Sequence, residues 1–150
     1  MTKIRGASNP LFHLANKYPR DWFNARIQAK ENILGMSVTN SQWVVWSAKL
    51  STRLIEGVWL RNGWTNTRDL IREKWKEDYK ITAITHKNGS NLLALTKGVH
   101  PGPQRYTPCK TPAKLLERAE TDWGEGRKIT FVGHDDDSWW ITTGKQIPWI

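Results

Sequence analysis

The sequence predicts a single α+β domain in which helices pack on antiparallel sheet. Three observations support this: β-rich segments are joined by tight turns, an amphipathic helical pattern precedes them, and this arrangement recurs about every 48 residues. A chain of 150 residues is long enough to bury a core without disulfides or metals. We expect an N-terminal leader over 1–30 and one domain of three helix–hairpin units, at about 31–66, 67–110 and 111–150.

The recurrence is clearest between the second and third units. Trp75, Ile81, Thr82 and His86 recur as Trp123, Ile129, Thr130 and His134, all at the same offset. A weaker first copy begins at Ile33, and one residue of slippage then aligns Trp43 with Leu92.

Each element follows from local patterns. The leader contains a short helix over 11–18, which ends before Pro19. In the second unit the β-rich segments 81–85 and 92–96 flank Asn88-Gly89, a pair typical of a hairpin turn. A third, shorter strand is expected after each hairpin, at 54–60 and near 104–107.

A helix is expected before each hairpin. Thr111 and Pro112 make a good N-cap and first helical residue, and Leu115, Ala119 and Trp123 then form one apolar stripe. Thr67 would cap the second helix, with Ile71 and Trp75 at the same spacing. We therefore expect Trp75 and Trp123 to be buried anchors of the core.

The charge is strongly basic and unevenly distributed. The net charge is +9 and the pI about 9.9. There are 8 basic and 3 acidic groups in 1–60 (+5), 10 and 4 in 61–110 (+6), and 5 and 7 in 111–150 (−2). This distribution indicates an anionic partner for the first two thirds, although a basic surface can also serve solubility alone.

Several classes of protein are disfavoured. No apolar run is long enough to span a bilayer, the N-terminus does not resemble a secretory signal, and the single Cys109 allows no internal disulfide, so we expect a cytoplasmic protein. Cys109 lies in a Pro-rich segment without a catalytic context, so we expect neither an enzyme nor a cofactor. The cluster 134–137 lacks the ligand pattern of a calcium loop and is interpreted as a hairpin turn, so we expect no metal.

The best candidate for a binding surface is a basic and aromatic segment at 53–80. Trp59 and Trp64 flank an Asn62-Gly63 turn, and Arg68 and Arg72 are spaced to share one helix face, opposite the apolar stripe. Aromatic rings interleaved with cations stack on bases and neutralise phosphates, although both Trp side chains can instead pack under a loop. The candidate residues are Arg53, Trp59, Arg61, Trp64, Arg68, Arg72, Lys74, Lys76 and Lys80.

One motif carries a resemblance to a known family. Its residues are Trp123-Gly-Glu-Gly126-Arg-Lys-Ile129-Thr130 in the third unit and, in the second, Leu95-Thr96-Lys97-Gly98 with Gln104. Over about 30–147 the chain resembles the Trp-rich repeat domain of unknown function found at the C-terminus of plant casein-kinase-1-like kinases and in cyanobacterial caspase-like proteins. The resemblance implies a non-catalytic accessory module without an established ligand. The chain departs from the pattern at Asp78, where the Gly matching Gly126 is expected, and it carries no kinase or protease domain.

Two functions follow from these observations. The first is a module that contacts the backbone of DNA or RNA through the basic and aromatic segment. The alternative is an adaptor for an acidic protein, or a scaffold subunit that self-associates through its basic second helix and an acidic third helix carrying Glu117, Glu120 and Asp122.

Overall fold

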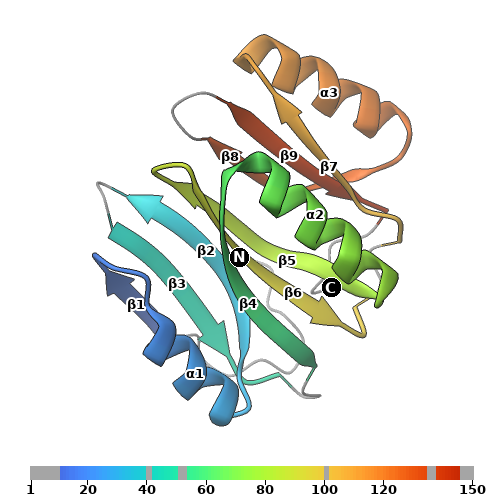
Figure 1. Cartoon of the computed structure of the whole chain (residues 1–150). Coiled ribbons are helices and arrows are strands. Elements are labelled where there is room, and N and C mark those ends of the chain that lie inside the picture. The colour runs from blue at the N-terminus through green and yellow to red at the C-terminus, as the bar shows by residue number, and fades with distance from the viewer. Residues whose placement is uncertain (1–10, 40–41, 51–53, 100–101, 135–137, 146–150) are drawn as a thin grey trace.

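The computed structural model describes residues 11–39, 42–50, 54–99, 102–134 and 138–145 (Figure 1). This part of the chain forms an α+β fold with three helices and three small antiparallel sheets of three strands each. The predicted fold class is therefore confirmed at this level. Among the described residues, no helix is both long and apolar enough to cross a membrane.

The three sheets follow one another along the chain, and each contains one helix between its first and second strands. The first is built from β1 (Leu11–Ala15), α1 (Arg20–Gln28), β2 (Asn32–Thr39) and β3 (Gln42–Ala48). The second is built from β4 (Ile55–Asn62), α2 (Gly63–Lys76), β5 (Tyr79–Lys87) and β6 (Ser90–Lys97). The third is built from β7 (Arg105–Cys109), α3 (Pro112–Gly124), β8 (Lys128–His134) and β9 (Trp139–Gly144).

The strand order differs from the predicted succession of helix, hairpin and extra strand. The orders are β1-β3-β2, β4-β6-β5 and β7-β9-β8, so the last strand of each sheet lies in its centre. The strand predicted at 54–60 exists as β4, but it pairs with β6 in the sheet that follows it. The third strand of each sheet therefore comes before the helix in the chain, and it pairs with the second strand of the hairpin.

The hairpins share one register. Met36 pairs with Val45, Ile84 with Leu93 and Val132 with Ile141, and the interval along the chain from each pair to the next is constant. The ladder is interrupted after Ile33, Ile81 and Ile129, which are separated by that same interval. The expected one-residue slippage is wrong, because Trp43 pairs with Val38 whereas Leu92 pairs with Thr85.

The helix predicted at 11–18 is also wrong. Leu11–Ala15 is strand β1, in which Phe12 pairs with Trp46 of β3. The helix of this region begins only after Pro19, at Arg20. Pairing with a strand that is distant in the sequence decides the conformation here, because strand formation depends on cross-strand packing more than on local preference.

The helix starts are partly as predicted. Thr111 caps α3 by accepting a hydrogen bond from the Lys114 amide at 3.2 Å, with Pro112 at the first helical position. In α2, by contrast, Asn62 is the N-cap residue and Gly63, with a φ of 73°, is the first helical residue, so Asn62-Gly63 is not a hairpin turn. Thr67 lies inside the helix and donates its hydroxyl to the Gly63 carbonyl at 2.8 Å.

The predicted turn of the second hairpin is confirmed. Asn88 and Gly89 both have positive φ, 50° and 71°, as the tight hairpin turn that matches strand twist requires.

The sheets stack on one another in a constant sense. Paired residues of an antiparallel sheet lie on the same face, so each sheet has a helix face, on which its own helix packs, and an opposite face. β2 runs beside β5 and β5 beside β8 (Figure 1). One core joins the helix face of the first sheet, including Phe23, Ile33 and Met36, to the opposite face of the second, including Leu92 and Ala94. A second core joins the helix face of the second sheet to the opposite face of the third, and its members include Ile71, Ile81, Ile84, Leu93, Tyr106 and Phe131.

At each of these two junctions, a polar side chain binds the backbone of the preceding sheet. Glu56 of β4 accepts hydrogen bonds from the Ile33 amide at 2.8 Å and the Thr96 hydroxyl at 2.9 Å. Burial raises the pKa of Glu56 to about 7, although these hydrogen bonds act to lower it. At the next junction, Gln104 accepts from the Ile81 amide at 2.7 Å and donates to the Ile81 carbonyl at 2.8 Å.

An aromatic stack also joins the second and third sheets. The imidazole of His86 lies on the indole of Trp140, with ring centroids 3.7 Å apart. This approach needs Gly133, because a Cβ there would lie 2.6 Å from the His86 ring. His86 is buried and meets the side chain of Asn91, which donates to the Thr67 hydroxyl at 2.5 Å.

The expectation that both helices end on a buried Trp is wrong. Trp75 is half-buried against the second core, but Trp123 is 63% exposed. The buried residue of α3 is instead Asp122, which is 1% exposed. The orientation of α3 follows from the partners of this carboxylate rather than from the apolar stripe.

Candidate nucleic-acid interface

Part of the predicted basic and aromatic segment lines a groove between α2 and β7, here called the α2–β7 groove, with a volume of about 280 Å³. Its α2 wall carries Trp64, Arg68, Ile71, Arg72 and Trp75. The β7 side is formed by Gln104, Arg105, Tyr106 and Thr107. Arg68 and Arg72 therefore share this groove with Ile71 and Trp75, and the prediction that they lie opposite that stripe is wrong.

Aromatic rings meet across the α2–β7 groove. Trp64 and Tyr106 have ring centroids 5.0 Å apart and planes tilted by 40°. Trp64 and Tyr106 are both half-buried, so part of each side chain remains available for contact. An adjacent aromatic pair beside cations is the combination that binds unpaired bases.

The arginines of the groove differ in their partners. Arg68 forms an ion pair with Asp69 at 3.1 Å on the surface of α2. Arg72 is exposed and, within the described part of the chain, forms no ion pair. Arg105 is committed to two carboxylates, those of Asp122 and Glu125, at 2.7 and 2.6 Å. The positive charge open to a ligand therefore comes mainly from Arg68 and Arg72.

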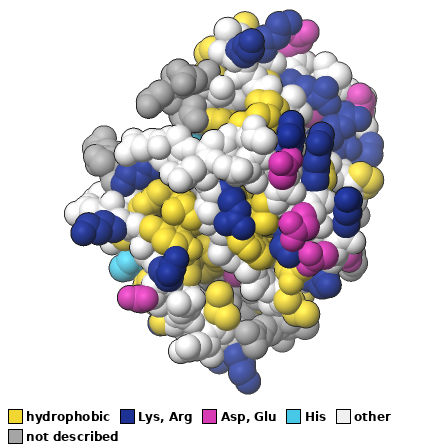
Figure 2. All heavy atoms as spheres, in the orientation of Figure 1, with side chains coloured by type: hydrophobic (Ala, Val, Ile, Leu, Met, Phe, Trp, Pro, Cys, Tyr) yellow, Lys and Arg dark blue, Asp and Glu magenta, His cyan; other side chains and the backbone are white. Residues whose placement is uncertain are grey.

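The three lysines of the predicted set are not among the residues that line this groove. Lys74 lies 5.8 Å from the Trp59 ring and is hydrogen-bonded to Glu77, which raises its pKa. Lys80 pairs with Asp78 at 3.0 Å, and Lys76 is exposed at the end of α2. Arg53 lies outside the described residues. Figure 2 shows Lys and Arg side chains among acidic and hydrophobic ones on this side of the molecule.

A second groove, here called the α1–β4 groove, lies between α1 and β4 and has a volume of about 530 Å³. It gathers Arg61 and Trp59 of the predicted set with Tyr18 and Arg20, which were not predicted. The guanidinium of Arg20 lies 6.0 Å from the centroid of the Tyr18 ring. The sequence did contain a signal for Arg20, because this residue precedes Arg68 by the same number of residues that separates one hairpin from the next. Tyr18, Arg20, Asn24, Val58, Trp59, Leu60 and Arg61 line the groove.

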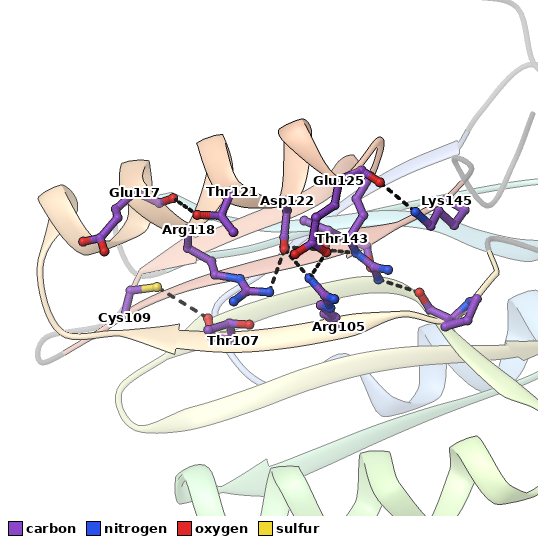
Figure 3. Close-up of polar contacts among 12 residues, drawn as sticks. Arg105, Thr107, Cys109, Glu117, Arg118, Thr121, Asp122, Glu125, Thr143 and Lys145 are labelled. Atoms are coloured by element: carbon purple, nitrogen blue, oxygen red, sulfur yellow. Dashed lines mark hydrogen bonds and ion pairs between the residues drawn. The ribbon is translucent and has the colours of Figure 1, made fainter.

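The third sheet carries a buried polar cluster beneath α3 (Figure 3). Asp122 accepts hydrogen bonds from Arg118 at 2.6 Å, Arg105 at 2.7 Å and the Thr143 hydroxyl at 2.7 Å. Burial alone would raise the pKa of Asp122, but the hydrogen bonds from Thr143, Arg105 and Arg118 together lower it. Arg127 extends the cluster by donating to Thr143 and to the Pro103 carbonyl. The predicted acidic surface on α3 is thus reduced, since one of its three carboxylates is internal.

The remaining candidate chemistry is limited. Cys109 is buried, and burial raises the pKa of its thiol, which disfavours the reactive thiolate. No group of three residues suited to holding a metal ion is found among the described residues. The Asp residues of the predicted turn, 135–137, lie outside them.

Comparisons with known protein families, curated proteins and solved structures find no match to this chain. The fold and the grooves define the described part of the chain as an α+β protein in which three small sheets stack, with an arginine- and aromatic-lined groove at each of the two junctions.

Proposed function

We propose that the chain is a non-catalytic module that binds the backbone of a single-stranded nucleic acid in its two grooves. The observation that carries the proposal is that both grooves combine Arg with Trp and Tyr: Arg68 with Trp64 and Tyr106 in one, Arg20 and Arg61 with Tyr18 and Trp59 in the other. Guanidinium groups neutralise phosphates, and aromatic rings stack on bases of any sequence. The net charge of +9 supports an anionic ligand.

A single strand fits this arrangement better than a duplex. Each groove lies between one helix and one β-strand and presents Trp and Tyr rings, and the bases of a single strand, unlike those of a duplex, have free faces that can stack on such rings. Contacts of this kind position the backbone and do not read the base sequence. We therefore infer binding that is weakly selective for sequence and strongly dependent on salt.

We also propose that the chain consists of three copies of one β-α-β-β unit, each about 48 residues long. The support is the common strand order of the three sheets and the constant interval between their register breaks. A repeated unit would explain why two neighbouring junctions each have a basic and aromatic groove. It would also agree with the resemblance to the Trp-rich repeat domain, which implies an accessory module.

The proposal is tested by fluorescence anisotropy with a labelled, mixed-sequence single strand of about 20 nucleotides, starting near 50 mM salt. The variant R68E/R72E reverses the two arginines of the α2–β7 groove and lowers the net charge from +9 to +5. We expect the affinity to fall about tenfold or more, and the salt slope to fall by about 1.4, since each neutralised phosphate of a single strand contributes about 0.7.

The matched control is K110E/K114E, which makes the same change in net charge at residues outside both grooves; these two lysines line a separate groove between β7 and α3 that has no aromatic side chain. If both double variants lose affinity equally, the binding reflects overall charge and the grooves are not the site. If the unmodified chain does not bind the single strand at all near 50 mM salt, the alternative of a protein adaptor is favoured.

A further inference from the structure

The stack of sheets has two different ends. Within the chain, the helix face of one sheet is covered by the opposite face of the next, and this occurs twice. As a result, Ile33 and Met36 of β2 and Ile81 and Ile84 of β5 are all buried. The covering sheet also supplies the side chain, Glu56 or Gln104, that binds the backbone of the first isoleucine.

The helix face of the third sheet has no such cover in the described structure. Ile129 and Val132 occupy the register positions of Ile81 and Ile84 in β8, yet they are 38% and 52% exposed. Trp123, at the end of α3, is also exposed, and the Lys128 ammonium lies 5.5 Å from the centroid of its ring. Among the described hydrogen bonds, no side chain binds the Ile129 backbone as Gln104 binds that of Ile81.

The opposite face of the first sheet is exposed in the same way. Phe12 and Leu14 of β1 are 64% and 60% exposed, and the Phe12 ring stacks on that of Trp46 at 5.9 Å. Phe12 and Leu14 correspond in strand register to Val58 and Leu60 of the second sheet, and those two residues pack against the first core. An exposed apolar surface of this kind, at both ends of a stack, marks an interaction site.

We propose that these two ends bind each other in different copies of this chain, so that copies associate head to tail. The helix face of the third sheet of one copy, with Ile129 and Val132, would be covered by the opposite face of the first sheet of the next, with Phe12 and Leu14. The proposed contact continues an interface that the chain already forms twice, between its first and second and its second and third sheets. This inference is independent of the proposed nucleic-acid binding.

Charge also favours contact between unlike ends. The first sheet, residues 11–48, carries 4 basic and 2 acidic groups (+2), and the third, residues 105–145, carries 7 and 7 (0). Head-to-tail contact therefore places a positive sheet against a neutral one, whereas contact between two first sheets would bring like charges together. Because the two surfaces are different, each added copy leaves one of each kind exposed and assembly does not close at a dimer.

The test is sedimentation velocity of the full chain over about 1 to 100 μM. F12E blocks one end, V132E blocks the other, and I55E is the control, because Ile55 is equally exposed but lies on the middle sheet. We expect the unmodified chain and I55E to form species that grow with concentration, and F12E and V132E each to remain monomeric. A mixture of F12E and V132E should form a one-to-one dimer and nothing larger, because each variant keeps one functional end.

Thermal melting checks that each variant is folded, and L14K and I129K replace any variant that is not. The proposal is overturned if the unmodified chain is monomeric over the whole range, or if F12E alone still dimerises, since two third sheets would then bind each other. It is also overturned if the mixture of F12E and V132E remains monomeric, or if I55E abolishes association.

Discussion

The carboxyl group of Glu56 should make the stability of this protein fall as the pH rises. Its pKa is raised by burial from 4.5 to about 7 in the folded protein. A carboxyl whose pKa is raised on folding binds its proton more tightly in the folded state, so its favourable contribution is complete below pH 4.5 and is lost as the pH rises to 7. The difference of about 2.5 pH units, from 4.5 to about 7, corresponds to on the order of 3 kcal/mol in the free energy of unfolding.

The substitution Glu56→Gln should remove this dependence, and Gln104 shows why the fold would accept it. Gln104 binds the Ile81 amide and carbonyl at the neighbouring junction with a neutral side chain. In the variant, the amide oxygen would still accept from the Ile33 amide, and the Thr96 hydroxyl can rotate to accept from the new amide group.

Urea denaturation followed by Trp fluorescence measures the effect, at pH values from about 4 to about 8. The difference in unfolding free energy between Glu56→Gln and the unmodified protein should be nearly constant near pH 4 and increase by on the order of 3 kcal/mol in favour of the variant by about pH 8. The reciprocal change, Gln104→Glu, should introduce a new loss of stability over the same pH range. If Glu56→Gln retains the full pH dependence of the unmodified protein, the carboxylate is not desolvated and the reasoning is refuted.

Three further predictions concern stability and reactivity. Trp123→Ala should change the unfolding free energy by no more than about 0.5 kcal/mol because the side chain is exposed, whereas Ile81→Ala should cost about 2–5 kcal/mol; equal losses in urea denaturation would contradict the assigned burial. Asp122→Asn should lower the unfolding free energy by about 3–5 kcal/mol at about pH 7, because it leaves two arginines without their buried partner. Since the pKa of Asp122 is lowered in the folded protein, this loss should shrink as the pH falls below 3.8. A loss that stays constant at acid pH would count against the ion pairs. Cys109 should react with a thiol reagent far more slowly in the folded protein than in urea, and equal rates would show that the thiol is accessible.

The sequence was sufficient to predict those features that depend on neighbouring residues. The α+β class, the turn at Asn88-Gly89 and the cap at Thr111 all follow from local preferences and are confirmed. The orientation of α3 was not predictable in this way. A spacing of four residues indicated that Trp123 faces the sheet, but Arg105, which lies 17 residues before Asp122, supplies an ion pair that turns Asp122 inward instead.

The candidate site shows the same division between local and distant information. The segment 53–80 is a candidate because basic and aromatic residues interleave along it, and the structure places Arg68 and Arg72 in a groove whose other wall is β7. Tyr106 of that wall and Tyr18 of the other groove could not be linked to the segment by any local pattern. The sequence feature that relates the two grooves is the recurrence of Arg20 as Arg68, at the same spacing that separates one hairpin from the next.

The central strand of the middle sheet, β6, differs from the other two central strands in its surroundings. Leu92 and Ala94 point into the first core and Leu93 and Leu95 into the second, and all four side chains are fully buried. Local opening should therefore start in the outer sheets and reach β6 last, since exposing its amides requires both cores to separate. We therefore expect the amides of β6 to exchange most slowly, and those of β1, where Leu11, Phe12 and Leu14 are exposed, to exchange much faster.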